Sequence, residues 1–349
     1  MARIPDRMAS TPVQGVKTWT LGECPWISSE ERFEPSARVI IDNDFAGDPD
    51  DLWQLVHHLL SPSVEIPLVV ASHLREDDPF DPSGESAKNA EAVAREVFSL
   101  MGLLDFDRIV RGSNEAMPDT QTPQDSGAAR AIIKEAMRDD TDLPLFYAAG
   151  GGLTDLASAL LLEPKIAERI RLIWIGGLEH SGLAYPPANA MPIEYNMLID
   201  VRAAREVFDC EDLEIWQIPR NMYRQCLVSH AELRARTRDC GRLGDYLYDS
   251  LIYETRRVED FIGGATETYA LGDQPLVLFT ALRSLFEADT SSSDFVLKVT
   301  PQVTADGTYR MRDKGRLMRV YTRIDTRTMF EDMFLKINEF VDWSESDQL

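Results

Sequence analysis

The strongest constraint on the fold is an alternation of short apolar runs with longer segments of helical period, starting near Ala37. The apolar runs have the length and aliphatic content of buried strands and cover 39–41, 66–71, 108–110, 145–148, 172–175 and 213–218. Helices are predicted between them over 50–60, 86–101, 127–138, 153–162 and 200–208. This order predicts a doubly wound α/β fold with a mainly parallel central sheet flanked by helices.

The two ends of the chain do not follow this alternation. Residues 1–36 lack a sustained period, which predicts an irregular N-terminal arm before a single α/β domain over 37–349. Beyond Pro219 the chain is polar and helix-rich to about 268. The final segments predict a helix over 274–288, hairpin-like strands within 294–323 with a turn at Asp306-Gly307, and a closing helix over 327–342.

The charge of the chain restricts its partners. There are 59 acidic and 36 basic residues, a formal net charge of −23. This charge argues against nucleic acid or an anionic membrane as a partner, because both are polyanions, and is compatible with a small neutral molecule and a bound cation.

Apolar runs and cysteines bear on the location of the protein. No apolar run approaches the roughly 20 residues of a membrane span, and the start of the chain has no signal-peptide character. The cysteines have no close C-x-x-C spacing, which predicts free thiols. We therefore expect a cytoplasmic protein with no membrane partner.

A cluster of acidic residues follows the first predicted strand, where sheets of this class bind ligands. The segment Asp42-Asn43-Asp44-Phe45-Ala46-Gly47-Asp48-Pro49-Asp50-Asp51 holds five carboxylates in ten residues. Such close anions repel one another, and Ca²⁺, which accepts six to eight oxygen ligands in flexible geometry, is the natural compensating ion. The alternative is a solvated acidic turn in which Asp50 and Asp51 begin a helix.

This segment resembles the amino-terminal fingerprint of the inosine-uridine preferring nucleoside hydrolase superfamily. Three further segments resemble the family in the same order along the chain: Gly150-Gly151-Gly152-Leu153-Thr154-Asp155-Leu156-Ala157; Gly176-Gly177 followed by Asn189 and Glu194-Tyr195-Asn196; and Leu271-Gly272-Asp273-Gln274-Pro275-Leu276. The resemblance extends from Asp42 to Asp273, roughly two thirds of the chain. It implies calcium-dependent hydrolysis of the N-glycosidic bond of ribonucleosides or a related N-ribosyl compound.

The resemblance also implies roles for individual residues. Calcium would be held by the carboxylates of Asp44, Asp51 and Asp273 and by the backbone carbonyl of Gly150, a ligand that any residue type could supply. Asp44 would in addition act as general base toward the attacking water.

Four residues would bind the sugar. Asp50 would bind the ribose 2′-hydroxyl, and Asn189, Glu194 and Asn196 would hold its 3′ and 5′ side. The resemblance further implies a homodimer or homotetramer.

The chain departs from the family pattern in two places. The step from Asp44 to Asp50 is two residues longer, so Asp42 or Asp48 could share the role given to Asp44. Gly272 stands where the family has its leaving-group histidine, and the segment 72–75 offers no match to a family asparagine. His73 or His180 could supply the missing acid, and Tyr185 or Tyr223 could stack on the base.

Two other functions compete with the hydrolase. One is a catalytically impaired ribose- or nucleoside-binding protein of the same fold. The other is a metal-dependent hydrolase of phosphate esters, against which the scarcity of Arg and Lys near the motifs argues.

Overall fold

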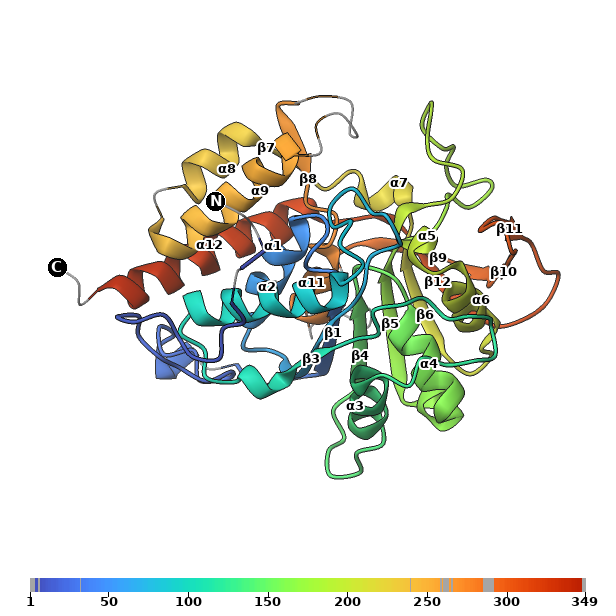
Figure 1. Cartoon of the computed structure of the whole chain (residues 1–349), viewed down its shortest axis with the longest axis horizontal. Helices are drawn as coiled ribbons and strands as arrows, with labels where there is room; N and C mark the ends of the chain where they lie inside the picture. Colours follow the sequence, from blue (N-terminus) through green and yellow to red (C-terminus); the bar gives the residue numbers. More distant parts are fainter. Residues whose placement is uncertain are drawn as a thin grey trace.

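The structure is a computed structural model that describes residues 4–5, 7–31, 33–238, 240–257, 259, 264, 266–284 and 292–346. An eight-stranded sheet with the order β3-β2-β1-β4-β5-β6-β12-β9 forms its centre (Figure 1). Its strands are β1 (Arg38–Asn43), β2 (Glu65–Ala71), β3 (Ile109–Arg111), β4 (Leu145–Ala149), β5 (Ile170–Ile175), β6 (Glu214–Ile218), β9 (Asp294–Val299) and β12 (Leu317–Arg323). All neighbouring pairs are parallel except β12 with β9. The predicted fold class is confirmed.

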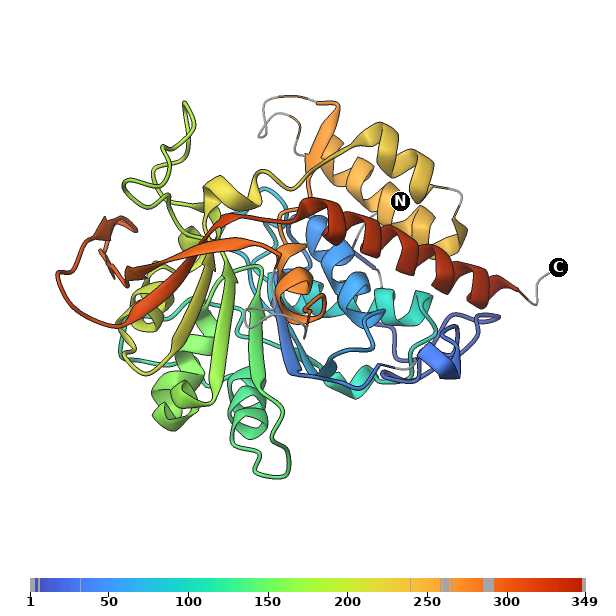
Figure 2. The same cartoon turned by 180° about the vertical axis from the view of Figure 1, so that it is seen from behind.

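Helices cover both faces of this sheet (Figure 2). One face packs against α1 (Asp50–Leu59), α2 (Ser86–Leu100), α9 (Gly241–Arg257), α11 (Pro275–Thr280) and α12 (Thr326–Glu345). The other packs against α3 (Gly127–Ala136), α4 (Thr154–Leu162) and α6 (Val201–Asp209). Strand β1 serves both cores, because Val39 and Ile41 point to the first face and Ile40 to the second.

The predicted strands and helices between residues 37 and 219 are all present, with small differences at their ends. Arg108 belongs to a short 3-10 helix, η2 (Phe106–Arg108), rather than to β3, and another, η3 (Pro164–Glu168), precedes β5. The predicted helix over 274–288 is shorter in the structure, since α11 ends at Thr280; residues 285–288 lie outside the described part of the chain.

Beyond β6 the helix-rich stretch forms a layer above α12. It contains α7 (Arg220–Tyr223), α8 (His230–Arg236) and α9, with a small antiparallel pair, β7 (Leu227–Ser229) and β8 (Thr268–Ala270). The predicted hairpin strands are also present: β9 and β12 pair with each other, and β10 (Gln302–Val303) pairs with β11 (Tyr309–Arg310) around the turn at Gly307, whose φ is +70°.

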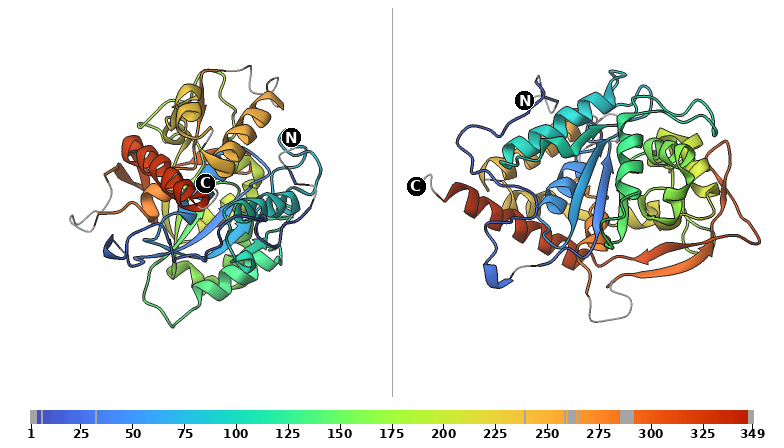
Figure 3. Two further views of the ribbon diagram at one scale, coloured as in Figure 1. Left: turned by 90° about the vertical axis from the view of Figure 1, so that its left-hand side faces the viewer. Right: turned by 90° about the horizontal axis from the view of Figure 1, so that it is seen from below.

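The N-terminal arm has irregular backbone apart from one short 3-10 helix, η1 (Ser29–Glu31), yet it is firmly packed. Trp19 is 2% exposed, and its indole Nε1 donates to the carbonyl oxygen of Met101 at 2.7 Å. Trp26 packs edge-on against Phe340 of α12, with ring centroids 5.3 Å apart. The arm thus passes from the side of α2 to that of α12 (Figure 3).

No helix among the described residues combines the length and the apolar character needed to cross a membrane. All four cysteines are free, as predicted: Cys24, Cys210, Cys226 and Cys240.

Removing the anchor of the arm tests how far it contributes to the fold. We expect Trp19→Ala to lower the free energy of unfolding by about 3 kcal/mol or more, because a buried indole and its hydrogen bond are lost. Phe33→Ala, which truncates a side chain that is 61% exposed, should change it by less than about 0.5 kcal/mol. Urea unfolding of both variants measures the difference, and equal effects would contradict the packing described.

Candidate active site

The acidic residues converge where the order of the sheet reverses. Strand β1 pairs with β2 on one side and with β4 on the other, so the chain connections leave in opposite directions at this point. Asp42 and Asn43 end β1, Gly150 follows β4, and α1 starts at Asp50. The carboxyl ends of parallel strands at such a reversal form a crevice in which ligands bind.

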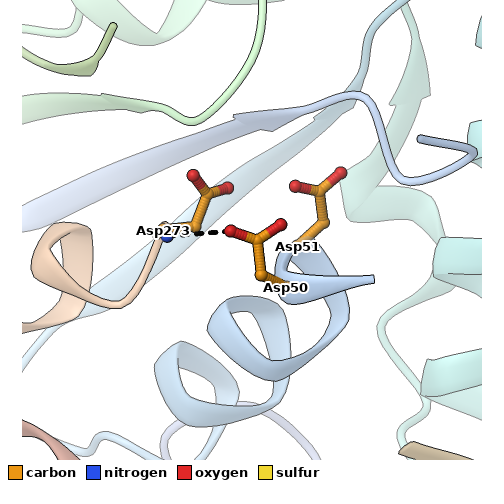
Figure 4. A group of neighbouring side chains, drawn as sticks. All are labelled: Asp50, Asp51 and Asp273. Carbon is orange, nitrogen blue, oxygen red and sulfur yellow. Dashed lines mark hydrogen bonds between the residues drawn. The ribbon is translucent and has the colours of Figure 1, made fainter. Parts of the chain in front are cut away.

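Three buried carboxylates form the centre of the site (Figure 4). Asp50 and Asp51 begin α1, and Asp273 lies in the turn before α11, so the group joins two segments that are far apart in sequence. One carboxylate oxygen from each residue lies within 4.8 Å of the others. The backbone N–H of Asp273 donates to Asp50 Oδ2 at 3.2 Å. We call these three residues the acidic cluster.

The acidic cluster fits a divalent cation. Asp51 Oδ2 and Asn43 Oδ1 are buried and have no hydrogen-bond donor within the described part of the chain. Buried oxygens without a partner are costly, whereas a hard cation is bound by such oxygens. These three aspartates and neighbouring oxygens are therefore suited to hold a metal ion.

Gly150 lies directly against this group of oxygens. A Cβ atom on Gly150 would come within 1.9 Å of Asn43 Oδ1 and 2.0 Å of Asp273 Oδ2. The expectation that any residue type could supply a carbonyl at this position is therefore wrong, because only glycine leaves room for the polar atoms beside it.

Asp44 lies next to the acidic cluster. A Cβ on Gly151 would lie 2.5 Å from Asp44 Oδ1, so the carboxylate rests against the backbone that follows β4. The tightest group thus contains Asp50, for which the sequence predicted a sugar contact, together with the two predicted ligands Asp51 and Asp273.

Burial raises the pKa of every carboxyl group here. The pKa values of Asp44, Asp50 and Asp51 lie well above the ordinary value, first because of burial and then because of the neighbouring carboxylates. Burial raises the pKa of Asp273 to about 7, with repulsion from Asp48 and Glu194 adding to the effect and hydrogen bonds to Asp51 and Asn43 opposing it. A cation would favour the ionised forms.

Two of the four residues predicted to bind the sugar, Glu194 and Asn196, are at the same edge of the sheet. Glu194 caps α5 (Tyr195–Ile199) by accepting from the backbone N–H of Asn196 and Met197, and it also accepts from Gly177 N at 2.7 Å. Asn196 Nδ2 donates to the carbonyl oxygens of Gly150 at 2.5 Å and Ile175 at 2.7 Å. Asn196 therefore fixes the carbonyl that the sequence predicted as a calcium ligand.

Comparison with known proteins now identifies the family. Residues 39–331 match the family model of the inosine-uridine preferring nucleoside hydrolase. The chain belongs to this family. The predicted family and its enzyme class, N-ribosyl hydrolase, are thereby confirmed.

The relatives agree with this assignment. An inosine-uridine preferring nucleoside hydrolase of Leishmania major is 30% identical over 125 residues, which cover 36% of this chain and 38% of that protein. One of Crithidia fasciculata is 41% identical over 69 residues, 20% of this chain and 19% of that protein. The aligned segments thus span well under half the length of these curated relatives.

A solved structure shows the same fold over a longer range. The purine-preferring ribonucleoside hydrolase from Gardnerella vaginalis superposes with a TM-score of 0.63 at 19% identity, covering 88% of this chain and 99% of that one.

Within this nucleoside hydrolase fold, three candidate residues lie away from the acidic cluster or are occupied. Asn189 and Tyr185 are exposed, in the loop between β5 and α5 that stands out from the body of the molecule (Figure 1). His180 is buried with Nε2 2.7 Å from Gln217 Oε1. Tyr185 is 90% exposed, so little of its ring packs against the rest of the protein.

His73 is also engaged in the structure. Its Nδ1 lies 2.8 Å from the carbonyl oxygen of Leu74, and its Nε2 lies 2.8 Å from Thr154 Oγ1. Neither His73 nor His180 therefore presents an unengaged Nε2 to a leaving base.

The structure adds a network of buried hydrogen bonds behind the acidic cluster. Asn43 Nδ2 donates to Asp273 Oδ2 at 2.8 Å and to Gln54 Oε1 at 2.9 Å. Gln54 Nε2 donates to His58 Nδ1, and His58 Nε2 lies 2.8 Å from Thr280 Oγ1. Because Gln54 Nε2 can only donate, His58 Nδ1 must accept, and the imidazole is neutral. Burial, followed by the charges of His57 and Lys336, correspondingly lowers the pKa of His58.

The sequence did not lead us to predict this hydrogen-bond network, although one signal was available. Gln54 and His58 are separated by four residues and so share one face of α1, the face that Asn43 meets. A polar pair at this spacing inside an otherwise apolar helix face indicates a buried network.

The raised carboxyl pKa values predict how calcium and pH act together. Asp273 has a folded-state pKa of about 7, above the roughly 4 of an unfolded aspartate. Its protonation therefore stabilises the metal-free fold fully below pH ~4, and this contribution is lost as pH rises through ~7. We expect Ca²⁺, relative to chelator, to raise Tm more at about pH 8 than at about pH 5.5, since binding requires the ionised form. Scanning calorimetry at both pH values measures this, and an equal shift would contradict a calcium-binding role for Asp273.

The hydrogen-bond network through Gln54 predicts an effect on metal affinity. We expect Gln54→Leu to weaken Ca²⁺ binding by about tenfold, because Asn43 then loses the partner that orients it toward Asp273. Isothermal titration calorimetry measures the affinity, and Gln121→Leu on an exposed loop is the control. Unchanged Ca²⁺ affinity in Gln54→Leu would show that the hydrogen-bond network does not position Asp273.

Proposed function

We propose that the protein hydrolyses the N-glycosidic bond of ribonucleosides, or of a related N-ribosyl compound, to free base and ribose, with Ca²⁺ as cofactor. The observation that carries the proposal is the acidic cluster: buried carboxylates from α1 and from the turn before α11 meet at the reversal point of the sheet. The family match over residues 39–331 supports this reaction class.

The reaction needs a carboxylate-rich site. Cleavage of an N-glycosidic bond passes through an oxocarbenium-like transition state, whose positive charge is stabilised by nearby anions. Asp44, Asp51, Asp273 and the Gly150 carbonyl would hold the calcium, with Asp50 beside them. When bound, the ion would acidify and orient a water molecule and the ribose diol.

Asp44 is the proposed general base. Its carboxylate lies against the backbone of Gly151 and interacts electrostatically with Asp273, and a cation would keep it ionised near neutral pH despite its burial. An ionised carboxylate at hydrogen-bond distance from the attacking water can accept its proton as the bond to the anomeric carbon forms.

The sugar would lie between Asp50 and Glu194. Asp50 would accept from the 2′-hydroxyl, while Glu194, Asn196 and Asn189 would face the 3′ and 5′ side. Asn189 would reach the sugar only after the exposed loop between β5 and α5 moves inward, a change of the kind that binding commonly produces in loops.

Replacement of one cluster residue tests the hydrolase. We expect Asp51→Ala to lower ribose release from the best nucleoside at least about 1000-fold, because a calcium ligand and part of the transition-state stabilisation, about 4 kcal/mol, are lost. Asp294→Ala, which removes an exposed carboxylate on β9, should keep full activity. A reducing-sugar assay over purine and pyrimidine ribonucleosides, with Ca²⁺ or with chelator, measures both.

The outcomes separate the candidate functions. Chelator-sensitive ribose release that is lost in Asp51→Ala supports the hydrolase. Nucleoside binding without turnover would instead support the ribose- or nucleoside-binding protein. The homodimer or homotetramer and the cytoplasmic location stay predictions, which sedimentation and fractionation can test.

A further inference from the structure

Three tyrosines around the acidic cluster each donate their hydroxyl proton to a carboxylate. Tyr195 donates to Asp78 Oδ2 at 2.6 Å, Tyr223 to Glu194 Oε1 at 2.8 Å, and Tyr269 to Asp48 Oδ1 at 2.5 Å. The side chains of all three tyrosines are half-buried. We call these three pairs the tyrosine–carboxylate rim.

The rim borders the acidic cluster directly. A Cβ on Gly272 would lie 3.3 Å from Asp50 Oδ2 and 3.4 Å from Tyr223 Cδ2, so Tyr223 stands beside the cluster and reaches from Asp50 to Glu194. The carboxylates of Asp48 and Glu194 act electrostatically on Asp273. Asp44 and Asp48 likewise act electrostatically on Tyr195.

The rim carboxylates serve as hydrogen-bond acceptors. Glu194 accepts three backbone N–H groups in addition to Tyr223. Asp78 accepts from Phe80 N at 2.9 Å and forms an ion pair with Arg75 at 3.2 Å.

The tyrosine hydroxyl groups are also engaged in hydrogen bonds. Each donates its single hydroxyl proton to a carboxylate, and burial together with that carboxylate raises the pKa of Tyr195 and Tyr223. These groups are thus arranged to hold negative charge, and not to release a proton to a departing base.

The balance of the reaction determines which substrates suit such a site. When the bond from C1′ to the ring nitrogen breaks, its electron pair goes to the base, and the water oxygen bonds to C1′ while its proton goes to Asp44. A neutral nucleoside then needs a second proton on the base, since the base would otherwise leave as an anion. A base that carries a formal positive charge leaves as a neutral molecule and needs no proton from the protein.

Charge and ring chemistry favour the same class of substrate. The carboxylates of Asp48 and Glu194, next to the acidic cluster, create a negative potential that attracts a cationic ring. The charge of Asp78 is offset by its ion pair with Arg75. Tyrosine rings bind cations through their faces, and a hydroxyl that donates to a carboxylate makes the ring more electron-rich.

We propose that the site selects N-ribosides whose base carries a positive charge, such as N7-alkylated purine ribonucleosides. Tyr223 and Gly272 form the wall beside Asp50, and the tyrosine–carboxylate rim supplies the selectivity. This inference rests on the hydrolase function proposed above and names its substrate class.

Three ribosides test the proposal on the full chain with Ca²⁺. Inosine and 7-methylinosine differ by one methyl group, which makes the purine a cation at pH values below the ionisation of its N1 proton. 4-Nitrophenyl riboside is neutral and has a leaving group that needs no proton. We expect kcat/KM for 7-methylinosine to exceed that for inosine at least about 100-fold, the lower end of what general acid catalysis contributes.

The outcomes for the three ribosides are distinct. Values within about tenfold for inosine and 7-methylinosine would overturn the inference and leave the hydrolase intact. Turnover of 4-nitrophenyl riboside, with no turnover of inosine or 7-methylinosine, would also overturn the inference and leave the hydrolase intact. No turnover of any of the three would count against the hydrolase itself.

A rim variant separates charge selection from the intrinsic reactivity of the substrates. Asp48→Asn keeps an oxygen acceptor for Tyr269 and removes one charge. We expect kcat/KM for 7-methylinosine to fall about tenfold more than kcat/KM for 4-nitrophenyl riboside. Asp294→Asn, which breaks an exposed ion pair with Arg323 on β9, is the matched control and should change neither.

Ionic strength gives a measurement on the unaltered protein. Raising salt should lower kcat/KM for 7-methylinosine and not for 4-nitrophenyl riboside, because salt screens the attraction of a cation. Equal effects of Asp48→Asn, or of salt, on both substrates would overturn the proposal.

Discussion

The repulsion among buried carboxylates is the constraint on which the rest of this structure depends. Asp44, Asp50, Asp51 and Asp273 are all removed from water at one edge of the sheet. Burial, followed by repulsion from neighbouring carboxylates, raises the pKa of Asp44, Asp50 and Asp51. Such a site is unfavourable unless positive charge and hydrogen-bond donors are aimed at it. The amide of Asn43 and the backbone N–H of Asp273 meet part of this need, and the proposed Ca²⁺ would meet the rest.

Close packing around these charges explains several residue choices that chemistry alone would not. Gly150 is required because Asn43 and Asp273 occupy the space of a side chain. The amide of Asn43 is oriented by Gln54, and Gln54 by His58, so the position of one carboxylate depends on a histidine in the last turn of α1. A burial environment that keeps His58 neutral is therefore part of the design of the site.

The order of the elements could be predicted from sequence because each strand of the parallel sheet is a continuous apolar run and each helix has its own period. The acidic segment after β1 could be singled out for a related reason, since clustered aspartates at the end of a strand have few structural roles. Asp273 was predicted through the resemblance of its segment to the family. Side-chain orientations could not be predicted in this way. The partners of His73 and His180, the network through Gln54, and the contact between Gly272 and Tyr223 join residues that are distant in sequence, and periodicity carries no information about them. The packing of the arm through Trp19 was missed for the same reason, because an irregular backbone leaves no period to detect.

The hydrogen bond from Asp273 to Asp50 joins residues 223 positions apart. Strands β1 to β6 lie side by side and can pair while the C-terminal third of the chain is still being synthesised, but the acidic cluster remains incomplete until Asp273 has left the ribosome. During that interval the carboxylates at the start of α1 lie at the edge of a formed sheet without Asp273. The site therefore becomes competent to bind a metal only after Asp273 has joined it, so an unfinished chain has the scaffold of the enzyme without its chemistry.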